Sequence, residues 1–153
     1  KPTDIVYDLY SGAGALSIYI SDEVQKVVGI ELVPSSVSDA QLNASLNGVK
    51  NCFFLLGDLK ERLTRDTQWI DEYGNPDIIL VDPPRSGMHP KVVQRVAHLS
   101  PSRIVYVSCN PATQARDIRS LSDAGYRLEY LQPVDLFPHT SHVETIAKLT
   151  RKS

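Results

Sequence analysis

The sequence predicts an α/β protein with a Rossmann-like fold, in which helices cover a mostly parallel sheet of seven strands. Short apolar runs alternate with helical patterns along the 153 residues. Continuous apolar runs of this kind are typical of parallel strands that are buried on both faces. The last two runs are joined by a connection too short for a crossover helix, so they are expected to form an antiparallel pair.

The strands are expected at residues 5–10, 26–32, 52–56, 77–81, 103–107, 126–132 and 143–150. The helices between them are expected at residues 15–22, 34–46, 60–69, 89–98 and 112–124. Pro34 suits a first helical turn, and Gly48 suits the residue after a helix end. Pro111 opens the last helix in the same way, with Ser108 or Asn110 as its cap.

The length fits one domain, residues 1–153, with a core of its own. Hydrophobic residues make up 42% and charged residues 22%, which is ordinary for a globular protein. No apolar run could span a membrane, and the first residues do not resemble a signal peptide. Two cysteines, Cys52 and Cys109, exclude a disulfide scaffold. We therefore expect a cytoplasmic monomer without membrane attachment, and the strand that follows Lys1 so closely suggests a fragment of a longer protein.

A glycine-containing turn, Asp-Leu-Tyr-Ser-Gly-Ala-Gly, follows the first strand. Gly12 and Gly14 would let the backbone approach a ligand closely at a helix N-terminus. Glu31 ends the second strand, where its carboxylate could accept hydrogen bonds from ribose hydroxyls; the alternative is a solvated loop carboxylate. Asp58 follows the third strand and could accept from an adenine amino group, or it could cap the next helix.

The identity of the cofactor follows from what this turn lacks. Ser17 stands where a dinucleotide-binding fingerprint has its third glycine, which argues against NAD. The turn contains no lysine to hold phosphates, and acidic residues follow successive strands. An adenosyl cofactor without phosphates fits best, and we expect S-adenosylmethionine (SAM).

The second half of the chain carries the groups suited to chemistry. Cys109 follows the fifth strand at a helix N-terminus, where the helix dipole favours a thiolate; the alternative is a buried structural cysteine. Asp82 follows the fourth strand and could orient a methyl donor or a base edge, or belong to a plain turn. Glu144 begins the last strand and could face the same cleft, or be an exposed carboxylate. His139 and His142 have no third ligand at a suitable spacing, so no metal is expected.

Four motifs in order resemble the RNA 5-methyluridine methyltransferases: Asp-Leu-Tyr-Ser-Gly-Ala-Gly, Asp-Pro-Pro-Arg-Ser-Gly, Ser-Cys-Asn-Pro-Ala-Thr and Phe-Pro-His-Thr-Ser-His-Val-Glu. The resemblance covers essentially the whole chain, as the SAM-dependent catalytic domain of that family with a class I methyltransferase fold. It implies that Cys109 adds to C6 of a uracil and that Glu144 removes the C5 proton. It also implies SAM contacts at Tyr10, Ala15, Glu31 and Asp82.

The sequence departs from the family pattern at two positions. Ser11 stands where cysteine is common, and Ala15 stands where asparagine is common, so only a backbone contact is expected at Ala15. The run at residues 136–140 resembles the 23S rRNA members more than the bacterial tRNA members, so RNA, and rRNA rather than tRNA, is the expected substrate.

The RNA-binding domain that the family carries upstream is not in this sequence, so the fragment alone is expected to be inactive. Two rival functions stay open. One is an N-methyltransferase acting on an amino group, which Asp-Pro-Pro after the fourth strand also suits. The other is a module that binds SAM or RNA without catalysis.

Overall fold

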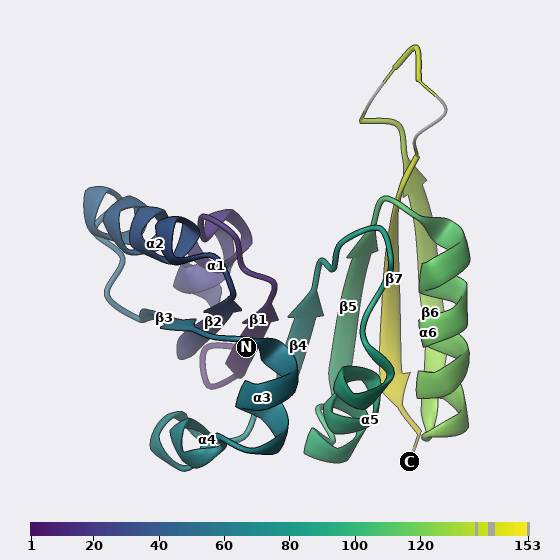
Figure 1. Cartoon of the computed structure of the whole chain (residues 1–153), viewed down its shortest axis with the longest axis horizontal. Coiled ribbons are helices and arrows are strands. Elements are labelled where there is room, and N and C mark those ends of the chain that lie inside the picture. Colours follow the sequence, from purple (N-terminus) through teal and green to yellow (C-terminus); the bar gives the residue numbers. More distant parts are fainter. Residues whose placement is uncertain (137, 141–142, 153) are drawn as a thin grey trace.

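The computed structural model describes residues 1–136, 138–140 and 143–152. These residues form one seven-stranded sheet in the order β3-β2-β1-β4-β5-β7-β6, with helices on both faces (Figure 1). The strands are β1 (Ile5–Leu9), β2 (Lys26–Glu31), β3 (Cys52–Leu56), β4 (Ile78–Val81), β5 (Arg103–Ser108), β6 (Tyr126–Val134) and β7 (Glu144–Arg151). Neighbours among β1 to β5 pair in parallel, whereas β7 is antiparallel to both β5 and β6. The expected fold class is confirmed.

The helices are α1 (Ala15–Ile20), α2 (Pro34–Leu46), α3 (Leu59–Thr64), α4 (Gln68–Tyr73), α5 (Pro90–Leu99) and α6 (Pro111–Asp123), and a short 3-10 helix, η1 (Ser21–Glu23), follows α1. The expectation of one helix at residues 60–69 is wrong, because α3 and α4 are separate. Asp66 and Thr67 stand where the next core-facing turn would fall, and short polar side chains favour helix ends. Trp69 instead enters the core from α4, and its Nε1 donates to the Arg62 carbonyl at 3.0 Å.

Two apolar clusters hold the sheet, one on each face. The larger cluster packs strand residues such as Tyr7, Ile104 and Leu149 against α5 and α6. The smaller joins Phe54 of β3 to the inner side of α2. Figure 1 shows α1 and α2 together beside β1 to β3, and α5 and α6 beside β5 to β7. None of the helices in the described parts of the chain is long and apolar enough to cross a membrane.

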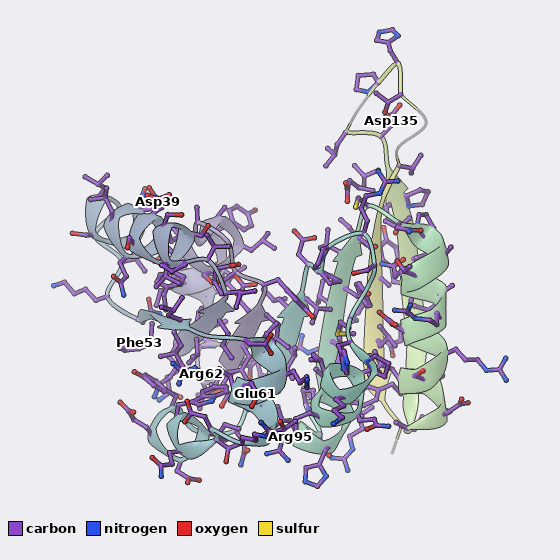
Figure 2. All side chains as sticks on the ribbon, viewed as in Figure 1. Asp39, Phe53, Glu61, Arg62, Arg95 and Asp135 are labelled. Carbon is purple, nitrogen blue, oxygen red and sulfur yellow. The ribbon has the colours of Figure 1, made fainter. Side chains whose placement is uncertain are left out.

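The direction of β7 decides which residues share an edge of the sheet. The carboxyl ends of β1 to β5 lie at one rim because these strands are parallel. Since β7 runs the other way, it begins at that same rim, where Thr145 pairs with Ser108 in the last β5–β7 rung. The described residues of the connection between β6 and β7 project beyond the rim, and Asp135 is one of them (Figures 1 and 2). A ligand at this rim would thus meet both parallel strand ends and the start of β7.

Candidate active site

Six of the predicted site residues follow the rim in spatial order. They are Asp58 after β3, Glu31 at the end of β2, Tyr10 after β1, Asp82 after β4, Cys109 after β5 and Glu144 at the start of β7. The other three, Gly12, Gly14 and Ala15, lie between β1 and the first turn of α1. The sheet order therefore places the expected cofactor residues on one half of the rim and the thiol on the other, with Asp82 between them.

A cavity of about 540 Å³ opens along the first half of this rim. Its lining includes Tyr10, Glu31, Asp58 and Asp82, so the structure brings four predicted cofactor residues together. Its apolar walls come from Ile30, Leu32, Val33, Leu59, Pro84 and Val92. Gly12, Gly14 and Ala15 are not among the lining residues.

Two polar lining residues, Lys60 and His89, were not among the predicted site residues. Lys60 lies in the first turn of α3, and His89 caps α5 by accepting from the Lys91 N–H through Nδ1 at 3.1 Å. Each follows a motif at a strand end by only a few residues. Their closeness to these motifs could have identified them in the sequence.

The Glu31 carboxylate is held by the backbone around it. Oε2 accepts from the Gly12 N–H at 3.0 Å, and Oε1 accepts from the N–H groups of Leu32 and Val33 at 2.8 and 2.9 Å. Because two carboxylate oxygens together offer about four acceptor sites, capacity remains for a ligand. Glu31 is therefore a fixed acceptor that also ties the glycine turn to β2, rather than a loosely solvated carboxylate.

Asp58 caps α3, as one of its two sequence interpretations expected. Its Oδ1 accepts from the N–H groups of Lys60 and Glu61 at 2.8 and 3.2 Å. The side chain also lines the cavity, so capping and a ligand contact through the other oxygen are compatible.

The glycine turn has a backbone that favours glycine. Gly12 and Gly14 have φ angles of +53° and +81°, and Tyr10 has +68°, which is uncommon for a residue with a side chain. A Cβ at Gly14 would lie 2.8 Å from Phe54 Cζ, so the turn packs closely on β3. Burial, and after it the charges of Asp117 and Asp58, raise the pKa of Tyr10 to about 12, so its phenol stays neutral at the cavity wall.

Below the turn, Asp8 is buried at the end of β1. Its Oδ2 accepts from Ser17 Oγ at 2.6 Å, so the serine that replaces the third glycine is a structural partner. Among the described residues, Asp8 Oδ1 and the nearby Ser11 Oγ have no hydrogen-bond partner. Burial, opposed by the Ser17 bond and reinforced by the charges of Asp82 and Glu31, raises the pKa of Asp8 to about 6.

The carboxylates of Asp82 and Glu144 lie close enough along the rim for their charges to interact. Loss of solvent around Asp82, and after it the negative charge of Glu144, raise the pKa of the Asp82 carboxyl. Two carboxylates from β4 and β7 thus lie near the strand end that carries Cys109.

Cys109 lies between two residues whose positions are fixed by hydrogen bonds. Ser108 Oγ accepts from the Asn110 N–H at 3.1 Å, and Asn110 Oδ1 caps α6 by accepting from the Ala112 N–H at 3.1 Å. Of the two expected candidates, Ser108 and Asn110, it is therefore Asn110 that caps α6. Cys109 itself is half-buried.

Helix α6 also fixes the loop that follows β4. Asn110 Nδ2 and Thr113 Oγ1 both donate to the Arg85 carbonyl, at 3.0 and 3.1 Å. The buried Asp117 carboxylate accepts from the Met88 N–H at 2.8 Å and from Tyr106 Oη at 2.7 Å. The loop that carries Asp82 is therefore tied to the helix that follows Cys109.

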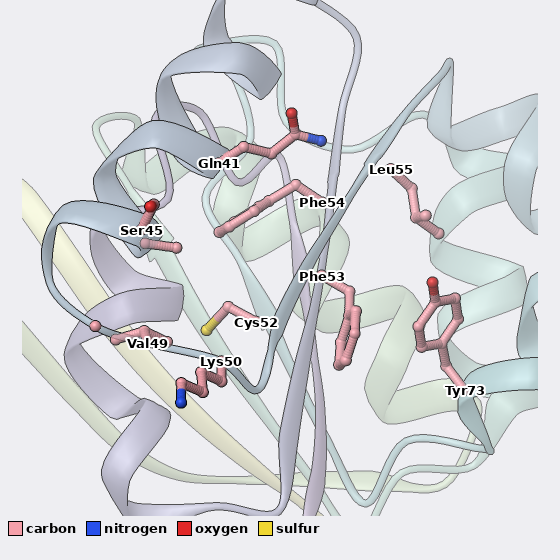
Figure 3. Close-up of a pocket in the computed structure, with 11 residues that line it drawn as sticks. Gln41, Ser45, Val49, Lys50, Cys52, Phe53, Phe54, Leu55 and Tyr73 are labelled. Atoms are coloured by element: carbon pink, nitrogen blue, oxygen red, sulfur yellow. The ribbon is translucent and has the colours of Figure 1, made fainter.

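A second cavity, of about 510 Å³, lies at the β3 edge between β3 and α2 (Figure 3). Cys52, Phe53 and Tyr73 are among its lining residues, and no predicted site residue lines it. Burial, and after it the charge of Asp8, raise the pKa of the Cys52 thiol to about 11, which keeps it protonated. Cys52 is thus a poor nucleophile in this environment.

The described residues contain no cluster of three His, Cys, Asp or Glu side chains that could hold a metal ion. His139 is exposed in the β6–β7 connection. Phe137, Ser141 and His142 of the fourth motif lie outside the described residues.

Comparisons with known proteins show the family of this chain. The family described as tRNA (uracil-5-)-methyltransferase matches residues 2–152. An uncharacterized RNA methyltransferase of Bacteroides thetaiotaomicron is 49% identical over 146 residues, which cover 95% of this chain and 32% of that protein. A similar protein of Porphyromonas gingivalis is 47% identical over 98% of this chain and 32% of its own length. This chain spans about a third of the length of these curated relatives.

A solved structure gives the same result at the level of the fold. The tRNA (uracil-54, C5)-methyltransferase of Pyrococcus abyssi, in complex with S-adenosyl-L-homocysteine, superposes with a TM-score of 0.83 at 36% identity. The match covers 97% of this chain and 34% of that protein. The resemblance seen in the four sequence motifs is thereby confirmed. The chain belongs to the tRNA (uracil-5-)-methyltransferase family.

Proposed function

We propose that this chain is the catalytic domain of a SAM-dependent enzyme that methylates C5 of a uridine in RNA. The observation that carries the proposal is the order of residues along the rim, from the acidic cavity through Asp82 to Cys109 and Glu144. The N-methyltransferase and the non-catalytic module are less well supported, because neither needs a thiol and a carboxylate beside the cofactor cavity.

The cavity fits SAM by the chemistry of its lining. Glu31, Asp58 and Asp82 supply acceptors and negative charge, which suit ribose hydroxyls, an adenine amino group and a cationic sulfonium. The same carboxylates would repel a pyrophosphate. Tyr10 and the apolar walls offer surface for the adenine. When bound, SAM supplies an electrophilic methyl group.

The side chains on the other half of the rim would carry the remaining steps. A Cys109 thiolate adds to C6 of the uracil, and the C5–C6 double-bond electrons move toward O4, which makes C5 nucleophilic. After C5 has gained the methyl group, Glu144 accepts the C5 proton. The C5–H electrons re-form the double bond, and the C6–S bond breaks to return the thiolate.

Trapping with 5-fluorouridine RNA tests the covalent step in a longer protein that joins this domain to the expected upstream RNA-binding domain. Fluorine at C5 cannot leave as a proton does, so a methylated adduct should stay attached to Cys109 and migrate slowly on denaturing gels. Cys109→Ser should give no such species, while Cys52→Ser, at the β3 edge, should trap RNA like the wild type. Turnover by Cys109→Ser at the wild-type rate would overturn the proposal.

The role of Glu144 has a separate test with ordinary uridine RNA. Glu144→Gln keeps the size of the side chain but removes the base, so the methylated adduct should persist. Release of the product at the wild-type rate would exclude Glu144 as the base.

The identity of the RNA is the finer part of the proposal. The sequence motif at residues 136–140 favours rRNA, whereas the related Pyrococcus structure is that of a tRNA enzyme. Parallel trapping with 23S rRNA and tRNA transcripts, each containing 5-fluorouridine, distinguishes them by which RNA forms the adduct at equal concentration.

A further inference from the structure

A buried polar network lies directly behind the two groups assigned to chemistry. Gln114 of α6 is only 2% exposed, and Thr145 of β7 is 6% exposed. Gln114 Nε2 donates to the Tyr106 carbonyl at 2.9 Å and to the Thr145 carbonyl at 3.2 Å. Thr145 Oγ1 lies 2.8 Å from Gln114 Oε1 and 3.1 Å from the Ser108 carbonyl, both of which can accept its proton.

This network joins the neighbours of the proposed nucleophile and base. Ser108 precedes Cys109, and Thr145 follows Glu144. The pair Ser108–Thr145 is also the last rung of the β5–β7 ladder. Cys109 and Glu144 therefore stand one residue beyond the rung that Gln114 and Thr145 hold.

Apolar packing alone does not fix the spacing of these two groups. In β7 the buried residues alternate, with Thr145, Ala147 and Leu149 on the core face. A slip of two residues would keep that alternation but move Glu144 by about 7 Å along β5. Gln114 meets a hydroxyl and a carbonyl together only at Thr145, so the observed register is the one that satisfies its amide.

The cost of burying these groups supports a specific role. A buried amide and hydroxyl are unfavourable unless each finds partners, whereas apolar residues of similar shape would fill the space without that demand. Fully satisfied buried networks fix one arrangement of the elements that they join.

We propose that Gln114 and Thr145 are positioning residues that hold Glu144 within reach of the C5 proton of a uracil attached to Cys109. The proposal rests on the function assigned above. Neither side chain touches the substrate in it; both act through the β5–β7 register.

The test separates adduct formation from adduct release. Thr145→Val keeps the side-chain shape and removes the hydroxyl, and Gln114→Met keeps the length and removes the amide. With ordinary uridine RNA, both variants should form the methylated adduct at close to the wild-type rate but release it between about 10- and 100-fold more slowly, as expected for a misplaced catalytic group. Thr145→Ser keeps the hydroxyl and should release the adduct at close to the wild-type rate. Ser120→Ala, on the exposed side of α6, should behave as wild type.

The outcomes divide clearly. Release at the wild-type rate in folded Thr145→Val and Gln114→Met overturns the positioning role, as does an equal loss of formation and release, which indicates only general destabilisation. If Thr145→Val does not fold, Gln114→Met and the comparison of Thr145→Ser with wild type still decide. If the wild-type domain, joined to the expected upstream RNA-binding domain, forms no adduct with 5-fluorouridine RNA, the proposed function fails instead.

Discussion

Single residues at the rim combine a structural bond with a position in the cavity wall. Glu31 binds three backbone N–H groups and also lines the cavity. Asp58 caps α3 and lines the same cavity. For Asp58, the two interpretations drawn from the sequence, a helix cap and a ligand group, are therefore compatible. The backbone bonds of Glu31 likewise leave room for a ligand contact, so mutations must be designed to separate the two roles.

Glu31→Ala should weaken SAM binding by about 1–3 kcal/mol, because hydrogen bonds to a charged acceptor are lost. Titration calorimetry measures the change in affinity. Glu23→Ala, which removes an exposed carboxylate from η1, should leave the affinity unchanged. Unaltered affinity in Glu31→Ala would show that this residue serves only the glycine turn.

Asp8 should make stability depend on pH in an unusual direction for a carboxyl group. Burial raises its pKa to about 6 from an ordinary 3.8, so the folded state holds a proton that the unfolded chain releases. The contribution to stability is fully present below about pH 4 and is lost as the pH rises through about 6.

Asp8→Asn should therefore gain stability relative to wild type between pH 4 and 7, by about 3 kcal/mol at most. Urea unfolding at several pH values measures this difference. Asp39→Asn, an exposed position on α2 (Figure 2), provides the control and should show no such trend. A constant difference between Asp8→Asn and wild type across this range would contradict the assigned pKa.

At the level of elements, the strand-to-helix turns place the site, and the glycine turn after β1 is closely packed. Gly14→Ala should destabilise the protein for two reasons, since its φ of +81° disfavours a side chain and the new Cβ would lie 2.8 Å from Phe54 Cζ. Gly48 shares a positive φ of +69°, but a Cβ there meets nothing within 4 Å. Gly48→Ala should thus show only the backbone term, about 1–2 kcal/mol.

Urea denaturation of both variants separates the two effects. The excess destabilisation of Gly14→Ala over Gly48→Ala measures the packing of the turn against β3. Equal losses in the two variants would mean that Phe54 moves aside at no cost.

Most elements could be predicted because apolar runs and helix caps are local signals. Pro34, Pro111 and Asn110 mark helix starts that the structure confirms. The break between α3 and α4 was missed because it depends on where Trp69 finds space in the core. The place of β7 between β5 and β6 also depends on pairing between distant segments, which no local pattern encodes.

The site was predictable to the same extent. Residues directly at strand ends, such as Glu31, Asp82 and Cys109, could be found because parallel strands share a rim. Gln114 could not, because its importance depends on Thr145, and only the fold brings the two together.

For the whole molecule, net charge limits what the domain can do alone. The 153 residues carry a formal charge of −2, so few phosphate contacts are expected. We expect weak RNA binding that changes little between about 50 and 200 mM salt, whereas proteins with many phosphate contacts lose about 10³–10⁵ in affinity. Filter binding of this chain and of the longer Bacteroides relative, to one RNA transcript, makes the comparison.

A steep salt dependence for this chain would show a basic surface that net charge conceals. Equal affinities of the two proteins would show that the rest of the relative adds nothing to RNA binding.

Because β7 is the last strand of the sheet in the sequence, the groups along the rim are not synthesised together. During synthesis the cofactor cavity and Cys109 emerge before Glu144, because β7 follows every other strand of the sheet in the sequence. A nascent chain could thus acquire a cofactor pocket and a thiol while it still lacks the proposed base. Since β7 lies between β5 and β6, the proposed base reaches the rim only when this strand has paired with β5.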